Sequence, residues 1–325
     1  MSRNYFSVFS SLILLLSSLA AILVAKSGQT EAKCDPVGRV TSDRDLHHPV
    51  GSKLCQGTLI SSKNLDIWCY KTRHPIHVSG WNLDINSICN QARSAISANY
   101  DSCSLGNKQN CFKTYKGVIN GGEPVVVLFS PYGKELIEKR PNLSWKSFAG
   151  ATSYRVEVSG PGVSWVRVIA TTSLPYPKNE SAFQYGNVYR IQVFAERKDT
   201  ILGNGTTIVN LLSQNETNTI ETLVRQVKNF HLLPDEAAYL DLDSIYMSKG
   251  LINATITSLE ARVNAGSHDP KIYSTLGERY LEAGLPVRAQ AKYRIAAKLA
   301  EEKADLAELQ KDQAKLKVLQ LHNRH

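Results

Sequence analysis

The sequence lacks the common motifs of enzyme active sites. It contains no phosphate-binding P-loop, no Gly-x-Ser-x-Gly nucleophile elbow, no His-Glu-x-x-His zinc motif and no Gly-x-Gly-x-x-Gly dinucleotide motif. Cysteine is absent after Cys111, and no Cys-x-x-Cys pair occurs, so the strongest zinc signatures are missing as well. Lysine and arginine give a net charge of +9 but form no dense block. We therefore expect no catalytic residue, metal or cofactor, and no nucleic-acid partner.

One long apolar run is present, and it lies at the N-terminus. Residues 6–25 carry no charge, with Arg3 before them and Lys26 after them. This pattern is typical of a signal peptide or of an N-terminal signal anchor over residues 1–25, because the run approaches the ~20 residues that cross a bilayer. Both interpretations stay open, including membrane anchoring through residues 6–25. In either case we expect the rest of the chain to be periplasmic or extracellular.

All six cysteines lie in the first third of the chain: Cys34, Cys55, Cys69, Cys89, Cys103 and Cys111. An even number of clustered cysteines behind a secretion signal predicts a disulfide framework, although the sequence does not choose the pairing. We therefore expect residues 34–120 to form a small, cysteine-rich β domain. The alternative is a metal-dependent or hydrolytic enzyme in this segment, which would draw on His47, His48, His74 and His77.

Alternating apolar and polar residues predict several strands after the last cysteine. Tyr154, Val156 and Val158 share one face of a strand, and another alternating set begins at Tyr189. Asn204-Gly205 is a typical two-residue turn, so a final hairpin is expected there.

The same region resembles a fibronectin type III module or a close immunoglobulin-like relative. Trp145 lies on an early strand, and Tyr154 begins the next. Phe183 and Tyr189 match a tyrosine corner, in which the second aromatic side chain turns back to its loop through the hydroxyl. The resemblance implies a β-sandwich over residues 124–212. Core packing is the preferred interpretation of its tryptophans.

From residue 220 the apolar period changes from two to about 3.6, which predicts helices as far as residue 325. The first helix is expected over 220–232, ending near Pro234. A pattern then repeats at an interval of 34 residues, in which Tyr239, Leu242 and Tyr246 correspond to Tyr273, Leu276 and Tyr280. Gly250 and Gly284 each follow a unit's last tyrosine by four positions, and each is expected to end a helix in a left-handed turn.

The repeat over residues 220–325 resembles the tetratricopeptide (TPR) family. Lys271–Lys303 matches one unit well, an imperfect unit precedes it, and residues 304–319 are expected to form a capping helix. The resemblance implies antiparallel helix pairs that bind peptides or protein surfaces in a concave groove. Asp241 and Asp243 stand two positions apart and so point in different directions on a helix. We expect both on solvated faces.

The ensemble of signal, sandwich and helix pairs resembles secreted bacterial envelope proteins, including cyanobacterial ones. That resemblance implies a multi-domain protein that acts by protein–protein interaction or scaffolding, with a protein partner. The candidate binding residues are Tyr246, Tyr280, Lys271 and Arg279.

A second hypothesis is a carbohydrate- or cell-wall-binding protein. It would use exposed aromatic side chains such as Trp68, Trp81 and Trp165. The net charge of +9 agrees with contact to an anionic polymer.

Overall fold

The computed structural model describes residues 34–43, 48–91 and 125–322. The expected signal or anchor, residues 1–25, lies outside the described residues, as do His47, Cys103 and Cys111. From Pro36 onward the chain belongs to one unit. Within the described ranges, no helix is both long and apolar enough to cross a membrane.

A four-stranded antiparallel sheet, here called sheet A, begins this unit. Its strand order is β2-β1-β3-β4, with β1 at Pro36–Asp43, β2 at Lys53–Cys55, β3 at Leu59–Cys69 and β4 at His74–Asp84, followed by helix α1 at Ile85–Gln91. Val40, Ile60 and Ile67 are fully buried in its core. A disulfide joins Cys69, at the end of β3, to Cys89 in α1.

The predicted disulfide-containing, sheet-rich N-terminal part is confirmed for the cysteines that the structure describes. Besides Cys69 and Cys89, both Cys34 and Cys55 are disulfide-bonded. These bonds are compatible with an oxidising, extracytoplasmic location.

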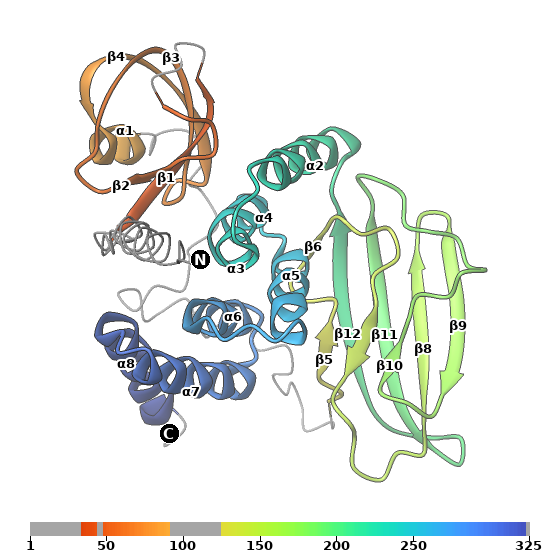
Figure 1. The fold of residues 1–325 in the computed structure, drawn as a ribbon. Helices are drawn as coiled ribbons and strands as arrows, with labels where there is room; N and C mark the ends of the chain where they lie inside the picture. The colour runs from red at the N-terminus through yellow and green to blue at the C-terminus, as the bar shows by residue number, and fades with distance from the viewer. Residues whose placement is uncertain (1–33, 44–47, 92–124, 323–325) are drawn as a thin grey trace, which may run out of the picture. The chain divides into compact units, whose positions relative to one another are not determined.

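Two further sheets lie between residues 125 and 211. Their strands are β5 (Leu128–Ser130), β6 (Glu135–Leu136), β7 (Leu143–Trp145), β8 (Ser153–Gly160), β9 (Val163–Ile169), β10 (Ser173–Leu174), β11 (Val188–Arg197) and β12 (Thr200–Leu211). The smaller sheet has the order β10-β7-β5. The larger has the order β6-β12-β11-β8-β9, and Figure 1 shows β12, β11, β8 and β9 side by side in that order. Within the larger sheet, β6 pairs with β12 in parallel and the other pairings are antiparallel. The buried residues of both sheets share one apolar core.

The expected alternation is present in this core. Tyr154, Val156 and Val158 on β8 are at most 4% exposed, and Trp145 and Tyr189 are buried with them. The Tyr189 hydroxyl accepts a hydrogen bond from the backbone N–H of Gln184 at 2.7 Å, so the predicted contact between this side chain and its preceding loop is also present. The preferred interpretation of the tryptophans as core residues is confirmed for both Trp145 and Trp165.

The expected hairpin at Asn204-Gly205 is wrong. These residues lie inside β12, and the β11–β12 hairpin turns instead at Lys198 and Asp199, which both adopt positive φ angles of 47° and 62°. Gly205 has another role, because a Cβ there would overlap the carbonyl oxygen of Val126. The Val126 N–H donates to the Asn204 carbonyl at 2.9 Å, so the glycine permits a close backbone approach between segments.

Strand β9 is one edge of the larger sheet. Val166 and Val168 on this strand are 49% and 60% exposed. Between them, the Arg167 side chain donates from Nη1 to the Val166 carbonyl at 2.8 Å and also pairs with Glu180. A charged side chain therefore covers part of an otherwise open strand edge.

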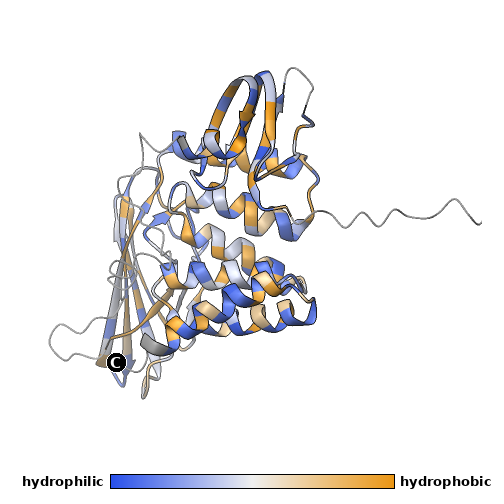
Figure 2. Cartoon of the chain, turned by 90° about the vertical axis from the view of Figure 1, so that its left-hand side faces the viewer, coloured by the Kyte–Doolittle hydropathy of each residue, from blue (hydrophilic) through white to orange (hydrophobic). Residues whose placement is uncertain are grey.

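The remainder of the described chain is helical, as predicted. The elements are α2 (Gln214–Asn229), α3 (Pro234–Glu236), the π-helical turn η2 (Ala237–Leu242), α4 (Asp243–Met247), α5 (Ile252–Asn264), α6 (Pro270–Glu282), α7 (Pro286–Glu302) and α8 (Leu306–His322). Figure 2 shows hydrophilic and hydrophobic residues interspersed along these helices.

Helix α2 begins six residues before the predicted start at 220. Its N-cap is Ser213, whose side chain accepts from the Glu216 N–H while the Glu216 side chain accepts from the Ser213 N–H. This reciprocal capping box satisfies backbone donors at the helix start. The signal Ser-x-x-Glu is present in the sequence, and the apolar period alone overlooked it.

Small residues allow the C-terminal helices to pack closely, as expected. A Cβ at Gly277 in α6 would lie 2.6 Å from the ring of Tyr293 in α7, and Ala289 and Ala296 are fully buried. Gly250 and Gly284 both adopt the expected positive φ angles, 65° and 76°. The residue after each glycine donates to the carbonyl of the tyrosine five positions before it, so the two turns, 34 residues apart, share one hydrogen-bonding pattern.

Candidate functional site

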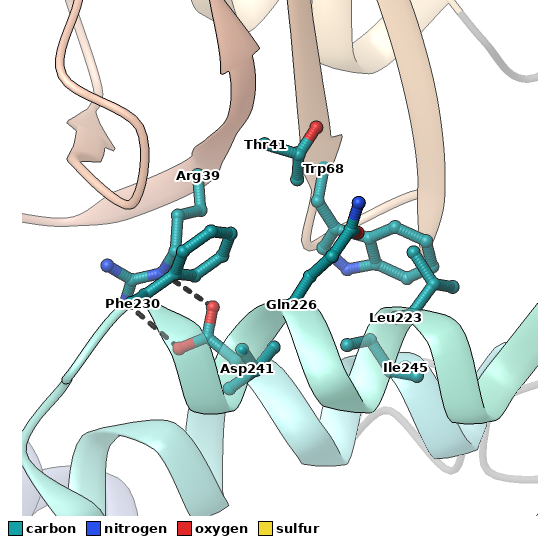
Figure 3. A pocket seen from close by; sticks show the side chains of 9 residues that line it. Arg39, Thr41, Trp68, Leu223, Gln226, Phe230, Asp241 and Ile245 are labelled. Carbon is teal, nitrogen blue, oxygen red and sulfur yellow. Dashed lines mark hydrogen bonds and ion pairs between the residues drawn. The ribbon is translucent and has the colours of Figure 1, made fainter.

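Arg39 forms a buried ionic contact between sheet A and the helices. Its side chain projects from β1, and the residue is 2% exposed. Nε and Nη2 donate to the two carboxylate oxygens of Asp241 at 2.6 and 2.9 Å (Figure 3). Nη2 also donates to Glu236 at 2.6 Å. Nη1 donates to the Gly51 carbonyl at 2.7 Å. Such forked, charge-assisted hydrogen bonds are among the strong ones in proteins.

Three other side chains of sheet A support this contact. Tyr70 donates its hydroxyl to Asp241 at 2.8 Å, and Lys53 pairs with Glu236 at 3.0 Å. Trp68 donates its indole N–H to the hydroxyl of Ser244 at 2.9 Å. We call the acceptor surface of Glu236, Asp241 and Ser244 the η2 face, because it spans the end of α3, the turn η2 and the start of α4.

The π-helical turn places two aspartates on opposite sides of one helical segment. Asp241 reaches Arg39, whereas Asp243 receives hydrogen bonds from Arg279 of α6 at 2.7 and 3.1 Å. The expectation that they point in different directions is correct, but the expectation of solvated faces is wrong, since they are only 2% and 8% exposed. Each carboxylate is buried because an arginine accompanies it. The arginines lie 202 and 36 positions away, where no local pattern reveals them.

A small cavity of about 10 Å³ lies at the same contact, with room for roughly one water molecule. It is lined by Arg39, Thr41, Trp68, Leu223, Gln226, Val227, Phe230, Asp241 and Ile245 (Figure 3). Sheet A and helix α2 therefore meet without closing completely over the ion pair.

At this contact, pairing with opposite charges offsets the cost of removing the charged groups from water. Burial raises the pKa of Asp241, although Arg39 and Tyr70 act against it. At Glu236 burial also acts to raise the pKa, but the hydrogen bonds from Arg39 and Lys53 outweigh it and the pKa falls below its usual value. Burial disfavours the charge on Arg39, yet its carboxylate partners raise its pKa further above the usual range.

A second polar cluster joins α6 to α8. The Ser274 hydroxyl donates to Asp312 at 2.6 Å, and Lys315 donates to Ser274 at 3.2 Å while it also pairs with Glu278. Asp312 is fully buried, and its second carboxylate oxygen has no hydrogen-bond partner among the described residues. Burial raises the pKa of Asp312 to about 6. Burial also acts to raise the pKa of Glu278, but Lys315 and Lys311 outweigh it and lower that pKa to about 2.

The four predicted binding residues have separate environments. Arg279 is 5% exposed and binds Asp243, and Tyr280 is 3% exposed. Tyr246 is half-buried against the apolar cluster beneath α2. Lys271 is half-buried near the start of α6, with its ammonium group 5.5 Å from the Tyr239 ring. A shared groove lined by all four stays a prediction.

Tyr280 is covered by the chain itself. The ring of Tyr132, from the β5–β6 connection, meets it edge-on with 6.0 Å between the centroids. The Tyr132 backbone N–H donates to Asn253 at 3.1 Å, and its hydroxyl accepts from Arg288 at 2.9 Å. The segment between the small strands therefore inserts into the cluster formed by α5, α6 and α7.

The aromatic residues of the carbohydrate hypothesis are not all exposed. Trp68 and Trp165 are only 4% and 5% exposed, so the expectation that they form a sugar-stacking surface is wrong. Their indole N–H groups bind Ser244 and Tyr176. Trp81 is 63% exposed and remains available.

Of the four histidines considered for a metal site, the structure describes His48, His74 and His77. His77 lies 2.8 Å from Asp66 through Nδ1, and both side chains are about half-exposed. Across the described residues, no group of three or more His, Cys, Asp or Glu side chains is placed to hold a metal ion.

No protein-family model matches this chain, and no curated protein matches it. Its function is therefore argued from its own residues. The residues that reasoning from sequence missed are Arg39, Trp68 and Tyr70 on one side and Glu236 and Asp241 on the other. One signal was available, since the pair Asp241 and Asp243 lies among the apolar positions of a helical repeat.

Proposed function

We propose that this protein is an extracytoplasmic interaction or scaffold protein whose helical region binds protein surfaces. We further propose that residues 124–212 are a fibronectin type III-like sandwich and that residues 220–325 are TPR-like. The strand orders and the Tyr189 contact support the first assignment. The Gly277–Tyr293 packing and the matched turns at Gly250 and Gly284 support the second.

One observation carries the proposal: the helical region accommodates two unrelated β surfaces of its own chain. On one side it receives Arg39 and Trp68 of sheet A through charged and polar acceptors. On the other it receives Tyr132 through an aromatic contact and two hydrogen bonds. Helices that form specific side-chain contacts with different β surfaces have the properties that a scaffold needs.

The location follows from two observations of different kinds. The disulfide-bonded cysteines are compatible with an oxidising compartment. The apolar run at residues 6–25 favours export or anchoring in a membrane. We propose the periplasm or the cell exterior on this basis.

The proposal is tested by a crosslinking pull-down from native envelopes with the full chain as bait. We expect a specific protein to be recovered in near-stoichiometric amount, and to be reduced by Lys271→Glu in α6. Lys146→Glu is the matched control, because it makes the same charge change at an exposed position outside the helices. Recovery of wall polymer in place of protein, or equal recovery with both variants, would contradict the proposal.

A further inference from the structure

Sheet A has a core of its own, separate from the cluster by which it meets the helices. Leu54, Ile60, Leu65 and Ile85 pack together inside the sheet and against α1, which the Cys69–Cys89 bond ties to β3. Trp68 does not belong to that core. It packs instead in a cluster with helical residues, which include Ile220, Val227 and Ile245. Separation of sheet A from the helices would therefore expose Trp68 but leave the apolar core of the sheet intact.

The contact has the composition of an interface between two proteins. Sheet A supplies Arg39, Trp68 and Tyr70, and these residue types dominate the binding energy of protein–protein interfaces. The η2 face supplies a complementary acidic surface, with both oxygens of Asp241 occupied by one guanidinium. Lys53 adds a second opposite-charge pair at its rim.

We propose that the η2 face is a docking surface for a β-sheet that presents an arginine beside aromatic side chains, and that sheet A occupies it reversibly within the same chain. The inference rests on the proposed function, because it names how one binding face of the helical region is kept covered. A partner that displaces sheet A would have to bring the same chemistry, an arginine flanked by a tryptophan or tyrosine.

The guanidinium group of Arg39 makes most of the charged hydrogen bonds between sheet A and the η2 face. Arg39 donates to Asp241, Glu236 and the Gly51 carbonyl. Tyr70 also donates to Asp241, but its hydroxyl is neutral and does not balance the charge of the buried carboxylate. Removing one member of a buried ion pair leaves the other desolvated and unpaired, which strongly disfavours the closed arrangement. The carboxylate regains water most simply if the two surfaces separate. The incompletely filled cavity beside Asp241 offers water its first point of entry.

The four tryptophans provide a direct test in the full-length chain, by ¹⁹F NMR after labelling with 5-fluorotryptophan. Trp68 reports on docking, Trp145 and Trp165 report on the separate sandwich core, and Trp81 provides the signal of an exposed ring. We expect Arg39→Ala to move the Trp68 resonance toward solvent exposure, with a solvent isotope shift that approaches that of Trp81. The resonances of Trp145 and Trp165 stay in place, and the docking equilibrium falls by roughly 100-fold or more.

Chemical rescue tests whether the face recognises a guanidinium. Methylguanidinium at tens of millimolar should return the Trp68 resonance of Arg39→Ala toward its original position, because it can form the same forked hydrogen bonds with Asp241. Methylammonium at the same concentration and ionic strength should not. Arg155→Ala is the matched control, since Arg155 pairs with Glu157 and Glu196 on the sandwich, and it should leave Trp68 unchanged.

Several outcomes would overturn the inference. An unchanged Trp68 resonance in Arg39→Ala, or equal rescue by methylammonium, would show that the guanidinium contact does not hold the sheet. If Arg39→Ala unfolds the protein, Arg39→Lys is used in its place. Simultaneous exposure of Trp68, Trp145 and Trp165 in Arg39→Lys would show that sheet A leaves the helices only when the whole chain unfolds. Because these measurements involve no partner, their failure is distinguishable from a failed pull-down.

Discussion

The sandwich and the contact at the η2 face are stabilised in opposite ways. The sandwich buries apolar and aromatic side chains, as in the stacked rings of Phe183 and Tyr189 with centroids 3.9 Å apart. The η2 face buries charges, which must be matched by partners from distant parts of the chain. Apolar burial tolerates many arrangements, whereas a buried charge requires one particular partner. The sandwich core therefore stabilises the fold, whereas the contact at the η2 face selects one particular partner and costs stability when that partner is missing.

The largest expected effect is the removal of a large side chain from the sandwich core. Trp145→Ala should lower the free energy of unfolding by about 4 kcal/mol, because it deletes a fully buried ring and leaves a cavity. Urea denaturation followed by circular dichroism measures the change. Trp81→Ala, at a position that is 63% exposed, should change stability by less than about 0.5 kcal/mol. Similar losses in both variants would refute the apolar half of the comparison.

The next effect concerns a buried charge in the helices. Asp312→Asn should raise stability at pH 7 by at most about 2–3 kcal/mol, because burial has lifted the pKa of Asp312 from 3.8 to about 6 and ionisation therefore disfavours the fold. The cost of burying the new amide N–H group beside no acceptor among the described residues is subtracted from this gain. Asparagine can still accept the hydrogen bond from Ser274. Thermal denaturation at pH 7 measures the gain, and a loss of stability would show that the ionised carboxylate is needed.

The same residue predicts a pH dependence with a definite sign. As pH falls from about 7 to 5, folded Asp312 takes up a proton before the unfolded chain does, so stability should rise. Below about pH 4.5 the effect reverses at Glu278, whose pKa of about 2 means that only the unfolded form takes up the proton. Asp312→Asn should reduce the rise without abolishing it, because burial also raises the pKa of Asp241 and Asp243. If the stability of the original protein and that of Asp312→Asn changed in parallel with pH, this role for Asp312 would be ruled out.

A smaller effect tests the close approach of α6 and α7. Gly277→Ala should destabilise the protein by about 1–2 kcal/mol, because the added Cβ would lie 2.6 Å from the Tyr293 ring. Helix propensity alone predicts the reverse, a gain of up to about 1 kcal/mol. The sign of the change in urea denaturation therefore decides whether packing or propensity governs this position.

The smallest effect concerns the start of α2. Ser213→Ala should cost about 1 kcal/mol, since it removes the acceptor for the Glu216 N–H from the capping box. Thr222→Ala, which removes an exposed hydroxyl from the middle of the same helix, is a suitable control in the same thermal denaturation experiment. A loss at position 222 equal to that at 213 would argue against the cap.

The sequence predicted those parts of the fold that depend on near neighbours. Alternation placed Tyr154, Val156 and Val158 in the core, and the interval of 34 residues located the turns at Gly250 and Gly284. The Asn204-Gly205 hairpin failed because a tertiary requirement, the approach of Val126, uses the glycine for another purpose. Local turn chemistry therefore predicts well only where no distant segment intervenes.

The candidate site could not be predicted from the sequence. Arg39 stands in a strand with no other charge until Asp43, and its partner Asp241 lies 202 positions later. A single arginine on a strand is normally solvated, and so is an aspartate on a helix. Only the docking of sheet A against the helices makes them partners. The same reason explains why Trp68 could be mistaken for an exposed aromatic residue.

The edge strand β9 has a consequence for behaviour at high concentration. Two neighbouring valines there, Val166 and Val168, would suit pairing between the sheets of two molecules. The Arg167 guanidinium already occupies the Val166 carbonyl and anchors itself to Glu180. A second molecule would have to displace this charged side chain before its own strand could add, so the fold carries a built-in safeguard against fibril-like self-association.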